Sequence, residues 1–369
     1  MTTFRQSLLG VFPVPLRSFL KSLRKKIRDQ IDFLYFPLWL VFQCARHRKK
    51  AVILYRLAAL GDVVCTLPMC GEIRKRHPGR LLVYVTSANY EKMVHLSRST
   101  DGVFGASWLY GTPWNYPGHF FGLVEKVYIP QTTTDERFPN VGAQSHLVDD
   151  LATSCDLTIP SSDRQPRLFP SPELIRTVCA EYGLTDDVAA GRLLIGINCG
   201  HTWPVREWSA AKWQQLVALF HTEFDATILQ FGLTHGSEDE YEHLCNVRFL
   251  ANRLKSDELV ALVAGCRLLV SIDSGPVHIA GAVGTPVIGL FGAVNPSLRL
   301  PPDSPAVGLF SNVPCRFCQH RTPIEHWKNG CPYDIRCMKE LEVHAVFEAI
   351  KSMIAKQAIM PSPTIFVSH

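Results

Sequence analysis

The segment Asp273-Ser274-Gly275-Pro276-x-His278 brings four kinds of group within about one helical turn. These are a carboxylate, a hydroxyl, a glycine backbone without a side chain, and an imidazole. The apolar run before this segment is short enough for a buried parallel strand. An apolar helix is predicted after it, with the proline at a first-turn position that needs no N–H. The free N–H groups at the start of such a helix attract phosphate or another anion. A diphosphate and a sugar hydroxyl would use this mixture of groups, although many turns of this kind bind nothing.

Two further charged residues stand where predicted strands give way to predicted helices. Arg206 lies in a small, polar loop just before a helix start. Its guanidinium could hold a diphosphate through two parallel hydrogen bonds, or it could form a surface ion pair with Glu207. Asp62 follows a glycine at the carboxyl end of a strand, where open α/β sheets bind ligands. A carboxylate there suits a general base, and it also suits the cap of the following helix.

Alternating strands and helices are predicted to hold these residues. The predicted strands cover 51–57, 81–86, 126–129, 193–197, 227–231, 248–251, 268–272 and 287–291. The predicted helices cover 63–77, 145–158, 208–220, 238–245, 256–264 and 277–283. This alternation predicts parallel sheets with helices on both faces, in two separate units. Residues 100–145, rich in aromatic residues and glycine, are predicted to be mostly long loops, and a proline-rich stretch from Pro160 to Pro172 leads into the predicted interdomain connection.

The composition indicates a globular protein of two ordinary domains. The chain has 369 residues, of which 47% are hydrophobic and 19% are charged. The net charge of +5 is unevenly distributed, because residues 1–50 contain eleven Lys or Arg and only two Asp. This head therefore carries +9 and the remainder of the chain carries −4. The slightly acidic body disfavours general binding of nucleic acid.

The basic head contains an apolar segment, residues 33–45, between two basic clusters. The segment is too short to span a bilayer, and Pro37 interrupts it. No small-residue cleavage site follows, which disfavours a signal peptide. Apolar and basic residues also alternate at roughly helical spacing from Leu16 onward. These features predict an amphipathic anchor on an anionic membrane surface, and the alternative is a solvated helix folded onto the body.

Twelve cysteines without a cleavable secretory signal indicate a reducing compartment. Eight of them are scattered singly and are predicted to be small core residues. The other four, Cys315, Cys318, Cys331 and Cys337, form a CxxC pair followed by two more cysteines, a spacing typical of zinc or iron ligands. The alternatives are buried free thiols or disulfides. A site made only of thiolates is usually closed, so a metal here would be structural.

Three motifs together resemble glycosyltransferase family 9, the ADP-heptose:lipopolysaccharide heptosyltransferases. The first is Arg56-Leu57-x-x-Leu60-Gly61-Asp62-Val63-Val64-x-Thr66-Leu67-Pro68. The second is the run from Trp203 to Trp208, followed by Ala211-Lys212-Trp213. The third is Asp273-Ser274-Gly275-Pro276-x-His278-x-Ala280, followed by Gly284-Thr285-Pro286-Val287 and Phe291-Gly292. The resemblance covers roughly residues 51–355 with the motifs in the family's order, and residues 100–145 and the head carry little of it.

The resemblance implies an α/β protein of GT-B architecture, in which two Rossmann-like, doubly wound domains face each other across a cleft. We expect a basic amphipathic extension at 1–50, an acceptor domain at 51–165 and an interdomain connection at 166–190. The nucleotide-sugar donor domain is then expected at 191–355, with the cysteine cluster at 315–337, and a tail follows at 356–369.

The resemblance also implies roles for individual residues. Asp62 matches the catalytic aspartate, the general base on the acceptor hydroxyl in an inverting transfer, with Arg56 and Gly61 on the acceptor side. The donor contacts would be Arg206 (commonly a lysine in the family), Asp273, Ser274, Gly275, His278 and, near the nucleotide ribose, Glu238. These groups would stabilise the leaving diphosphate, a task that other enzymes give to a metal ion, so no cofactor is required for catalysis. Similar cysteine sets recur in relatives that hold iron or zinc, which favours a structural metal.

The function implied is the transfer of a heptose, or a related sugar, from an ADP-sugar to a lipopolysaccharide core or another glycan acceptor. The acceptor would be a membrane glycolipid, and the protein would lie on the cytoplasmic face of the inner membrane. One alternative is a non-catalytic sugar-nucleotide-binding or scaffold protein of the same fold, which would bind the donor without turnover. Another is a nucleotide-sugar epimerase, which would need additional acid and base groups in the cleft.

Overall fold

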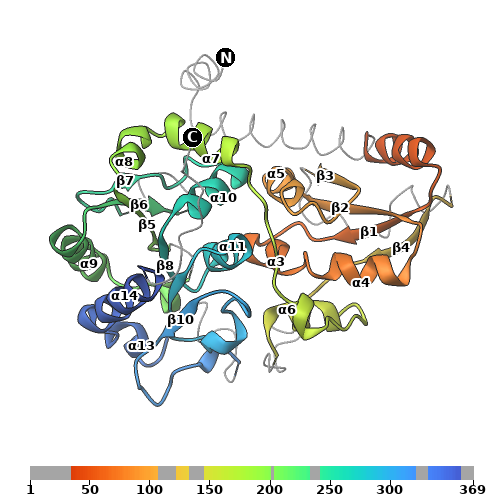
Figure 1. Ribbon diagram of the computed structural model, residues 1–369. Helices are drawn as coiled ribbons and strands as arrows, with labels where there is room; N and C mark the ends of the chain where they lie inside the picture. Colours follow the sequence, from red (N-terminus) through yellow and green to blue (C-terminus); the bar gives the residue numbers. More distant parts are fainter. Residues whose placement is uncertain are drawn as a thin grey trace, which may run out of the picture.

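The chain folds into two parallel β-sheets with helices packed on them (Figure 1). The computed structural model describes residues 35–106, 122–132, 145–200, 203–232, 242–320 and 331–358. The strands of one sheet lie between residues 51 and 128, and those of the other lie between 193 and 309. The prediction of two α/β units with parallel sheets is therefore confirmed, while the domain boundaries stay a prediction.

The N-terminal sheet has four parallel strands in the order β3-β2-β1-β4. They are β1 (Ala51–Tyr55), β2 (Leu81–Ser87), β3 (Gly102–Ala106) and β4 (Val124–Tyr128). All five residues of β1 are buried, as expected for a central strand covered on both faces. Val52 and Leu54 pack with the helices α3 (Leu60–Cys65) and α4 (Met69–Arg76). The alternate side chains of β1 point to the other face, where the helical residues 35–47 cover the sheet.

The C-terminal sheet has six parallel strands in the order β10-β9-β8-β5-β6-β7. They are β5 (Leu193–Asn198), β6 (Ala226–Phe231), β7 (Arg248–Phe249), β8 (Leu268–Ile272), β9 (Val287–Leu290) and β10 (Ala306–Leu309). The order of the strands reverses between β5 and β8. In doubly wound sheets, ligands bind outside the carboxyl ends of the strands at such a reversal. The segments that follow β5 and β8 carry Arg206 and Asp273, so this edge is where a ligand site is expected.

Helices pack on both faces of the C-terminal sheet. They are α7 (Pro172–Glu181), α8 (Thr185–Ala189), α9 (Ala210–Glu223), α10 (Ser256–Gly265), α11 (Gly275–Val283), α13 (Arg336–Lys339) and α14 (Val343–Ala358). Residues of α10 and α11 share a buried cluster with Leu269 of β8 on one face. Residues of α9 and α14 pack with Val270 of the same strand on the opposite face. Because both faces of these strands are buried, their sequences are continuous runs of apolar residues.

The two units contact each other through α3 and α11, which lie side by side (Figure 1). The buried apolar cluster that begins at Val52 of β1 continues through α10 and α11 into the second sheet. Because α3 follows β1 and α11 follows β8, the carboxyl ends of both central strands face this contact. The helices α5 (Glu91–His95) and α6 (Leu147–Thr153) complete the N-terminal unit.

Several elements differ from the sequence-based expectation. The predicted helix 63–77 is two helices, α3 and α4, because the intervening Pro68 has no N–H to continue the first one. The strand β3 was not expected, since two glycines lower its apolar periodicity. The stretch 166–190, predicted as a connection, contains the helices α7 and α8.

The predicted helix 238–245 is wrong over its described part, residues 242–245. The backbone N–H of Leu244 donates to Gln230 Oε1 at 3.2 Å. The N–H of Cys245 donates to Gln214 Oε1 at 2.7 Å. Side chains of the neighbouring strand and helix thus replace the helical carbonyls as acceptors.

None of the helices in the described part of the chain is both long enough and apolar enough to cross a membrane. Helical residues 35–47 include most of the apolar segment of the basic head. The rest of the predicted anchor, residues 1–34, lies outside the described residues.

Candidate active site

The start of α11 is an uncapped helix end at the point where the strand order reverses. No side chain caps its first turn, although Ser274 occupies the N-cap position. The Ser274 hydroxyl instead accepts a hydrogen bond of 2.7 Å from Nδ2 of Asn198, the last residue of β5. Neighbouring strands therefore fix the hydroxyl, and the helix start that follows is suited to an anion.

Arg206 lies beside this helix start, in the short turn Pro204–Arg206. Its Nε stands 3.3 Å from Oδ2 of Asp273, its Nη1 donates to the Asp273 carbonyl at 3.3 Å, and its Nη2 donates to Gln319 Oε1 at 3.1 Å. The guanidinium also lies over the ring of Trp203, 4.4 Å from its centroid. Burial lowers the pKa of Arg206, and the charge of Asp273 opposes that effect.

The close approach of Arg206 and Asp273 does not satisfy both groups. Nε of Arg206 and Oδ2 of Asp273 are buried, yet neither has a hydrogen-bond partner with acceptable geometry. Buried polar atoms of folded proteins are nearly always hydrogen-bonded, so an orphaned pair at a helix start points to a missing ligand. A phosphate oxygen would accept from the guanidinium, and a sugar hydroxyl would donate to the carboxylate.

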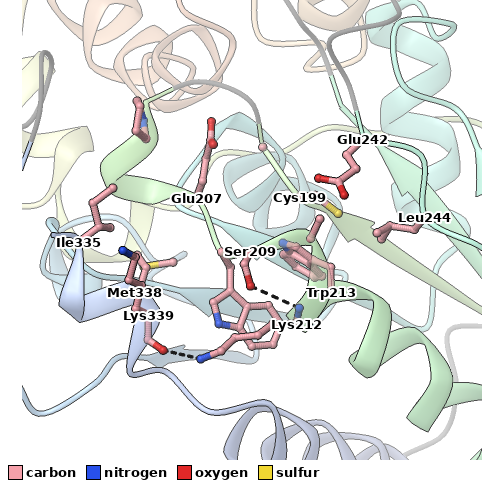
Figure 2. A pocket seen from close by; sticks show the side chains of 14 residues that line it. Cys199, Glu207, Ser209, Lys212, Trp213, Glu242, Leu244, Ile335, Met338 and Lys339 are labelled. Carbon is pink, nitrogen blue, oxygen red and sulfur yellow. Dashed lines mark hydrogen bonds between the residues drawn. The ribbon is translucent and has the colours of Figure 1, made fainter.

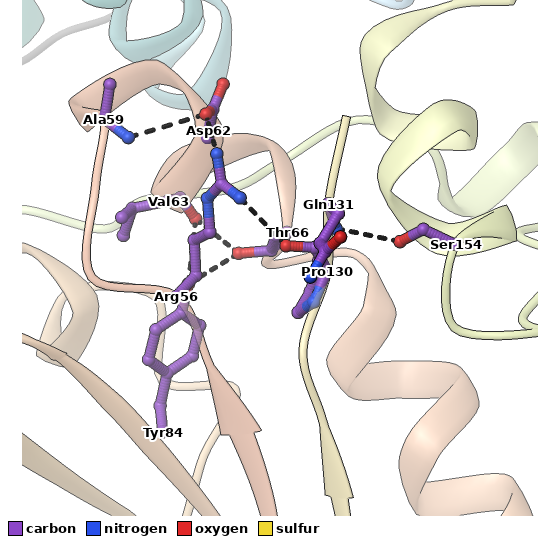
Figure 3. A network of polar contacts seen from close by, with 9 residues as sticks. All are labelled: Arg56, Ala59, Asp62, Val63, Thr66, Tyr84, Pro130, Gln131 and Ser154. Atoms are coloured by element: carbon purple, nitrogen blue, oxygen red, sulfur yellow. Dashed lines mark hydrogen bonds and ion pairs between the residues drawn. The ribbon is translucent and has the colours of Figure 1, made fainter. Parts of the chain in front are cut away.

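Asp62 is the third residue of α3, on the N-terminal side of the domain contact. Its Oδ2 pairs with Arg56 and accepts a 3.4 Å hydrogen bond from the N–H of Ala59 (Figure 3). Arg56 is held in turn by the carbonyl of Pro130, at 2.8 Å, in the segment after β4. Both contacts of the carboxylate fall on one oxygen, and Figure 3 shows the other oxygen directed away from Arg56. Asp62 thus contacts the start of its own helix and still presents one oxygen for a proton.

Two glycines bring the Asp62 and α11 segments into direct contact. A Cβ on Gly61 would lie 2.8 Å from Cδ2 of His278, and a Cβ on Gly275 would lie 2.9 Å from Cδ2 of Leu60. Carbon atoms in ordinary contact stand farther apart, so each segment needs a glycine where the other one packs. The sequence analysis assigned Gly61 to the acceptor side and Gly275 to the donor side. The structure places the two glycines on opposite sides of one contact.

His278 is the buried member of this contact. Its Nδ1 lies 3.3 Å from Sγ of Cys65 in α3. Burial lowers the pKa of His278 to about 4, although the charge of Asp273 acts in the opposite direction. The imidazole is therefore neutral near pH 7 and offers hydrogen bonds rather than a charge.

Two site residues were not identified from the sequence. Arg299, after the short turn Pro296–Leu298, is only 7% exposed, and its Nη1 donates to the Leu298 carbonyl at 3.0 Å. Within the described chain it forms no ion pair. Its charge lowers the pKa of His278 and of Arg206, which places it in the same cleft. A single arginine between two leucines was the available signal, because apolar neighbours on both sides suggest burial.

His146 is the second missed residue, and it connects the two units. It caps α6, where its Nδ1 accepts from the N–H of Val148 at 3.3 Å. Its Nε2 donates to the carbonyl of Leu300 at 2.9 Å, across the domain contact. The residue lay at the start of a predicted helix, but nothing in its sequence context indicated the contact with residue 300.

Glu238, expected near the nucleotide ribose, lies outside the described residues. A pocket of about 540 Å³ lies between the segment that follows β5 and the helix α9 (Figure 2). Cys199, Glu207, Glu242 and Lys212 are among the residues that line it. The described residues of its wall include neither Arg206 nor any residue from Asp273 to His278, so the pocket is distinct from the orphaned Arg206–Asp273 pair.

The four clustered cysteines lie in the region of Gly292, in the segment that follows β9. The N–H of Phe317, next to Cys318, donates to the Gly292 carbonyl at 2.9 Å. Sγ of Cys337 occupies the space where a Cβ of Gly292 would lie, at 2.7 Å. All twelve cysteines of the chain are free thiols, so the disulfide alternative is wrong for this structure.

The thiols gather in one region without forming a coordination site. Burial, and to a smaller extent the neighbouring Cys318, Cys315 and Cys331 in that order, raises the pKa of Cys337 to about 12. In the described residues, no group of three or more His, Cys, Asp or Glu side chains is arranged to hold a metal ion. The donor chemistry suits zinc or iron, while the distances needed for ligation are not present.

Comparisons with known proteins agree with the arrangement of the two units. A family model described as glycosyltransferase family 9 (heptosyltransferase) matches residues 154–328, which contain the second and third motifs. Lipopolysaccharide heptosyltransferase 1 of Pseudomonas aeruginosa is 27% identical over 160 residues, which is 42% of this chain and 44% of that protein. The alignment with this curated relative thus spans less than half of the relative's length.

Two solved structures share the fold over most of the chain. The E. coli ADP-heptose lipopolysaccharide heptosyltransferase II superposes with a TM-score of 0.62 at 15% identity, over 84% of this chain and 99% of that one. The iron-containing dodecameric glycosyltransferase TibC of enterotoxigenic E. coli gives 0.63 at 14% identity, over 85% of this chain and 80% of that one. A further structure of TibC is a complex with ADP-D-β-D-heptose. The expected GT-B architecture is therefore confirmed.

Proposed function

We propose that this chain, with its family 9 match and its heptosyltransferase fold, transfers a heptose or a related sugar from an ADP-sugar to a glycan acceptor. The observation that carries the proposal is the orphaned Arg206–Asp273 pair at the start of α11, in contact through Gly61 and Gly275 with the segment of Asp62. The start of α11 and the Asp62 carboxylate face the same domain contact. That arrangement suits a reaction between two bound substrates.

The reaction we propose is a single displacement with inversion. The free oxygen of Asp62 accepts the proton of the acceptor hydroxyl as that oxygen forms a bond to the anomeric carbon of the sugar. The bond between this carbon and the diphosphate breaks on the opposite side, and ADP leaves. Arg56 holds the other oxygen of Asp62, so the carboxylate cannot rotate away from the acceptor.

Charge on the leaving ADP is stabilised by groups already in place. Arg206 supplies a partly buried positive charge and Arg299 a buried one, and the start of α11 supplies backbone N–H groups. Ser274 and the neutral His278 add hydrogen bonds to the phosphates and the sugar. Together these groups replace the metal ion that many nucleotide-sugar enzymes use, so we propose a reaction without a catalytic cofactor.

The choice of ADP and heptose rests on the resemblance and on the similar proteins, two of which carry ADP-heptose in their descriptions. Glu238 is proposed to bind the nucleotide ribose. We propose a lipopolysaccharide core or a similar membrane glycolipid as the acceptor, and the cytoplasmic face of the inner membrane as the place of transfer. The four cysteines are proposed to hold a structural zinc or iron once their side chains rotate inward, in line with the iron-containing TibC.

The test is calorimetric binding of ADP and UDP, together with ADP release from ADP-heptose in the presence of lipopolysaccharide core. We expect Arg206→Ala to weaken ADP binding, because it removes a charge-assisted contact, and Asp62→Asn to bind ADP normally without turnover. Lys212→Ala serves as the matched basic control, since this residue contacts the carbonyls of Lys339 and Leu341 rather than the cleft. A response to UDP alone would overturn the ADP-heptose assignment, and turnover in Asp62→Asn would exclude this residue as the base.

A further inference from the structure

Helical residues 35–47 present apolar side chains on two opposite faces. On the inner face, Phe36, Leu40 and Cys44 are buried against the N-terminal sheet. Their spacing of four residues is the period of one helix face. Phe36 and Trp39 also pack their rings against Phe104 of β3, at centroid distances of 4.8 and 5.4 Å. The inner face therefore attaches the helix firmly to the domain.

The outer face is equally apolar and largely exposed, although the Tyr35 ring lies 6.0 Å from that of Phe104. Tyr35, Leu38 and Phe42 are 53%, 69% and 60% exposed, and Val41 is 40% exposed. At 100° per residue these side chains fall within about one third of the helix circumference. Four large apolar residues on one exposed face form a continuous patch rather than scattered single exposures.

A run of positive charge continues from the end of this helix. Arg46, Arg48, Lys49 and Lys50 are all exposed, and none of them forms an ion pair with another described residue. No Asp or Glu occurs anywhere from residue 33 to residue 50. The preceding part of the sequence, residues 1–32, adds seven more Lys or Arg against two Asp. The basic run thus follows directly along the chain from the helix that carries the apolar patch.

We propose that the outer face of helix 35–47 docks onto an anionic lipid surface, with the helix axis in the plane of the membrane. The patch, residues 35–42, is about 12 Å long at 1.5 Å per residue, less than half of the hydrocarbon thickness, so it can lie in the interface but cannot cross it. Apolar side chains enter the boundary between headgroups and acyl chains while the basic run contacts the phosphates.

The charge argues against a second copy of this chain as the occupant. A symmetric contact through the patch would bring two basic runs together, each without acidic partners in the segment, and this repulsion opposes association. An anionic membrane attracts the same run. The inference goes beyond the proposed transfer, and its test needs neither donor nor acceptor.

The experiment is sedimentation of the full chain with vesicles of phosphatidylcholine alone and with vesicles that contain about one third phosphatidylglycerol. We expect binding to the anionic vesicles that weakens as salt is raised. Leu38→Glu/Phe42→Glu should lose at least tenfold in affinity, because it places charge in the apolar patch. Lys49→Glu/Lys50→Glu should lose roughly tenfold or more on anionic vesicles only, since each basic residue at such a surface contributes a factor of about five.

The matched control is Val307→Glu/Phe310→Glu, which changes two exposed apolar residues near β10. It should bind vesicles within twofold of the wild-type protein. Thermal unfolding of each variant shows whether a loss of binding reflects the surface or the fold. The proposal is overturned if the wild-type chain ignores anionic vesicles or if Leu38→Glu/Phe42→Glu binds as well as wild type. It is also overturned if size-exclusion light scattering finds a dimer that this double variant separates, because the patch would then be a protein interface.

Discussion

The replacement Gly61→Ala tests whether the contact between the two domains controls the reaction. The added methyl group would stand 2.8 Å from Cδ2 of His278 and 3.3 Å from the Cα of Gly275. Forcing one methyl group into packed surroundings costs about 1–3 kcal/mol. The backbone of Gly275 cannot rotate away as a flexible side chain would, so the strain falls on His278 and on the separation of the domains.

The same substitution also has a favourable effect, which a matched variant can measure. Alanine is a better helix former than glycine by about 1 kcal/mol. Gly71 lies in the next helix, α4, and a Cβ there would meet no atom within 4 Å. Gly71→Ala should therefore be neutral or stabilising and fully active. The difference between the two variants isolates the contact with His278 from helix propensity.

If the two domains move apart to relieve this strain, the groups on the two domains no longer act together, and the enzyme stabilises the transition state less. A cost of about 1–3 kcal/mol corresponds to a fall in kcat/KM of roughly five- to 150-fold. The assay is the initial rate of ADP release with saturating acceptor, with thermal unfolding to confirm that Gly61→Ala is folded. Gly61→Ala activity within twofold of Gly71→Ala, with both proteins folded, would show that the close approach of the two segments is irrelevant to turnover.

Three more predictions follow from the buried charges and thiols. The pKa of His278 is about 4 in the folded protein and about 6.5 in the unfolded chain, so between these pH values the unfolded chain binds one more proton. The free energy of unfolding should therefore fall by up to about 3 kcal/mol as the pH drops from about 6.5 to about 4. Comparing the melting temperature at pH 7 and pH 5 in wild type and in His278→Gln checks this, and an equal loss in both would contradict it. Arg299→Met should keep or raise the melting temperature, since it removes a buried charge that forms no ion pair with a described residue, yet weaken ADP binding at least roughly tenfold in calorimetry. Unaltered ADP affinity would remove Arg299 from the donor site. Cys318→Ser should reduce bound zinc or iron, measured by plasma mass spectrometry, from about one atom per chain to near zero, and it should lower the melting temperature by several degrees. The control Cys245→Ser, which replaces an exposed single cysteine, should change neither the metal content nor the melting temperature. A metal-free wild-type protein would contradict this proposal.

The elements of the fold follow from the sequence wherever burial is two-sided and uninterrupted. Strands such as β5 and β8 are continuous apolar runs, and their ends are clear. Prediction failed where a local interaction overrode periodicity. Pro68 divided an otherwise helical segment, and the side chains of Gln214 and Gln230 captured the backbone at 244–245.

The candidate site was predictable in its residue types but not in its connections. The charge and glycine pattern identified Arg206, Asp62 and the start of α11. No spacing along the chain could show that Arg206 meets Asp273, because this contact joins segments that follow two different strands of one sheet. Nor could it show that Arg56 holds one oxygen of Asp62, because these residues lie at opposite ends of a turn. Arg299 was missed because a single arginine carries no periodic signal, and its two leucine neighbours indicate burial without indicating which site it faces.

The paired glycine contact between α3 and α11 has a consequence for how this protein can acquire new substrates. The contact uses Leu60 and Gly61 on one side and Gly275 and His278 on the other. An N-terminal half taken from a related enzyme would need a glycine and a leucine at the same two positions to dock on this C-terminal half. The residues that form this contact must stay the same, whereas the rest of each domain can vary. Exchange of whole halves, rather than gradual remodelling of one cleft, is then an accessible route to a new sugar acceptor.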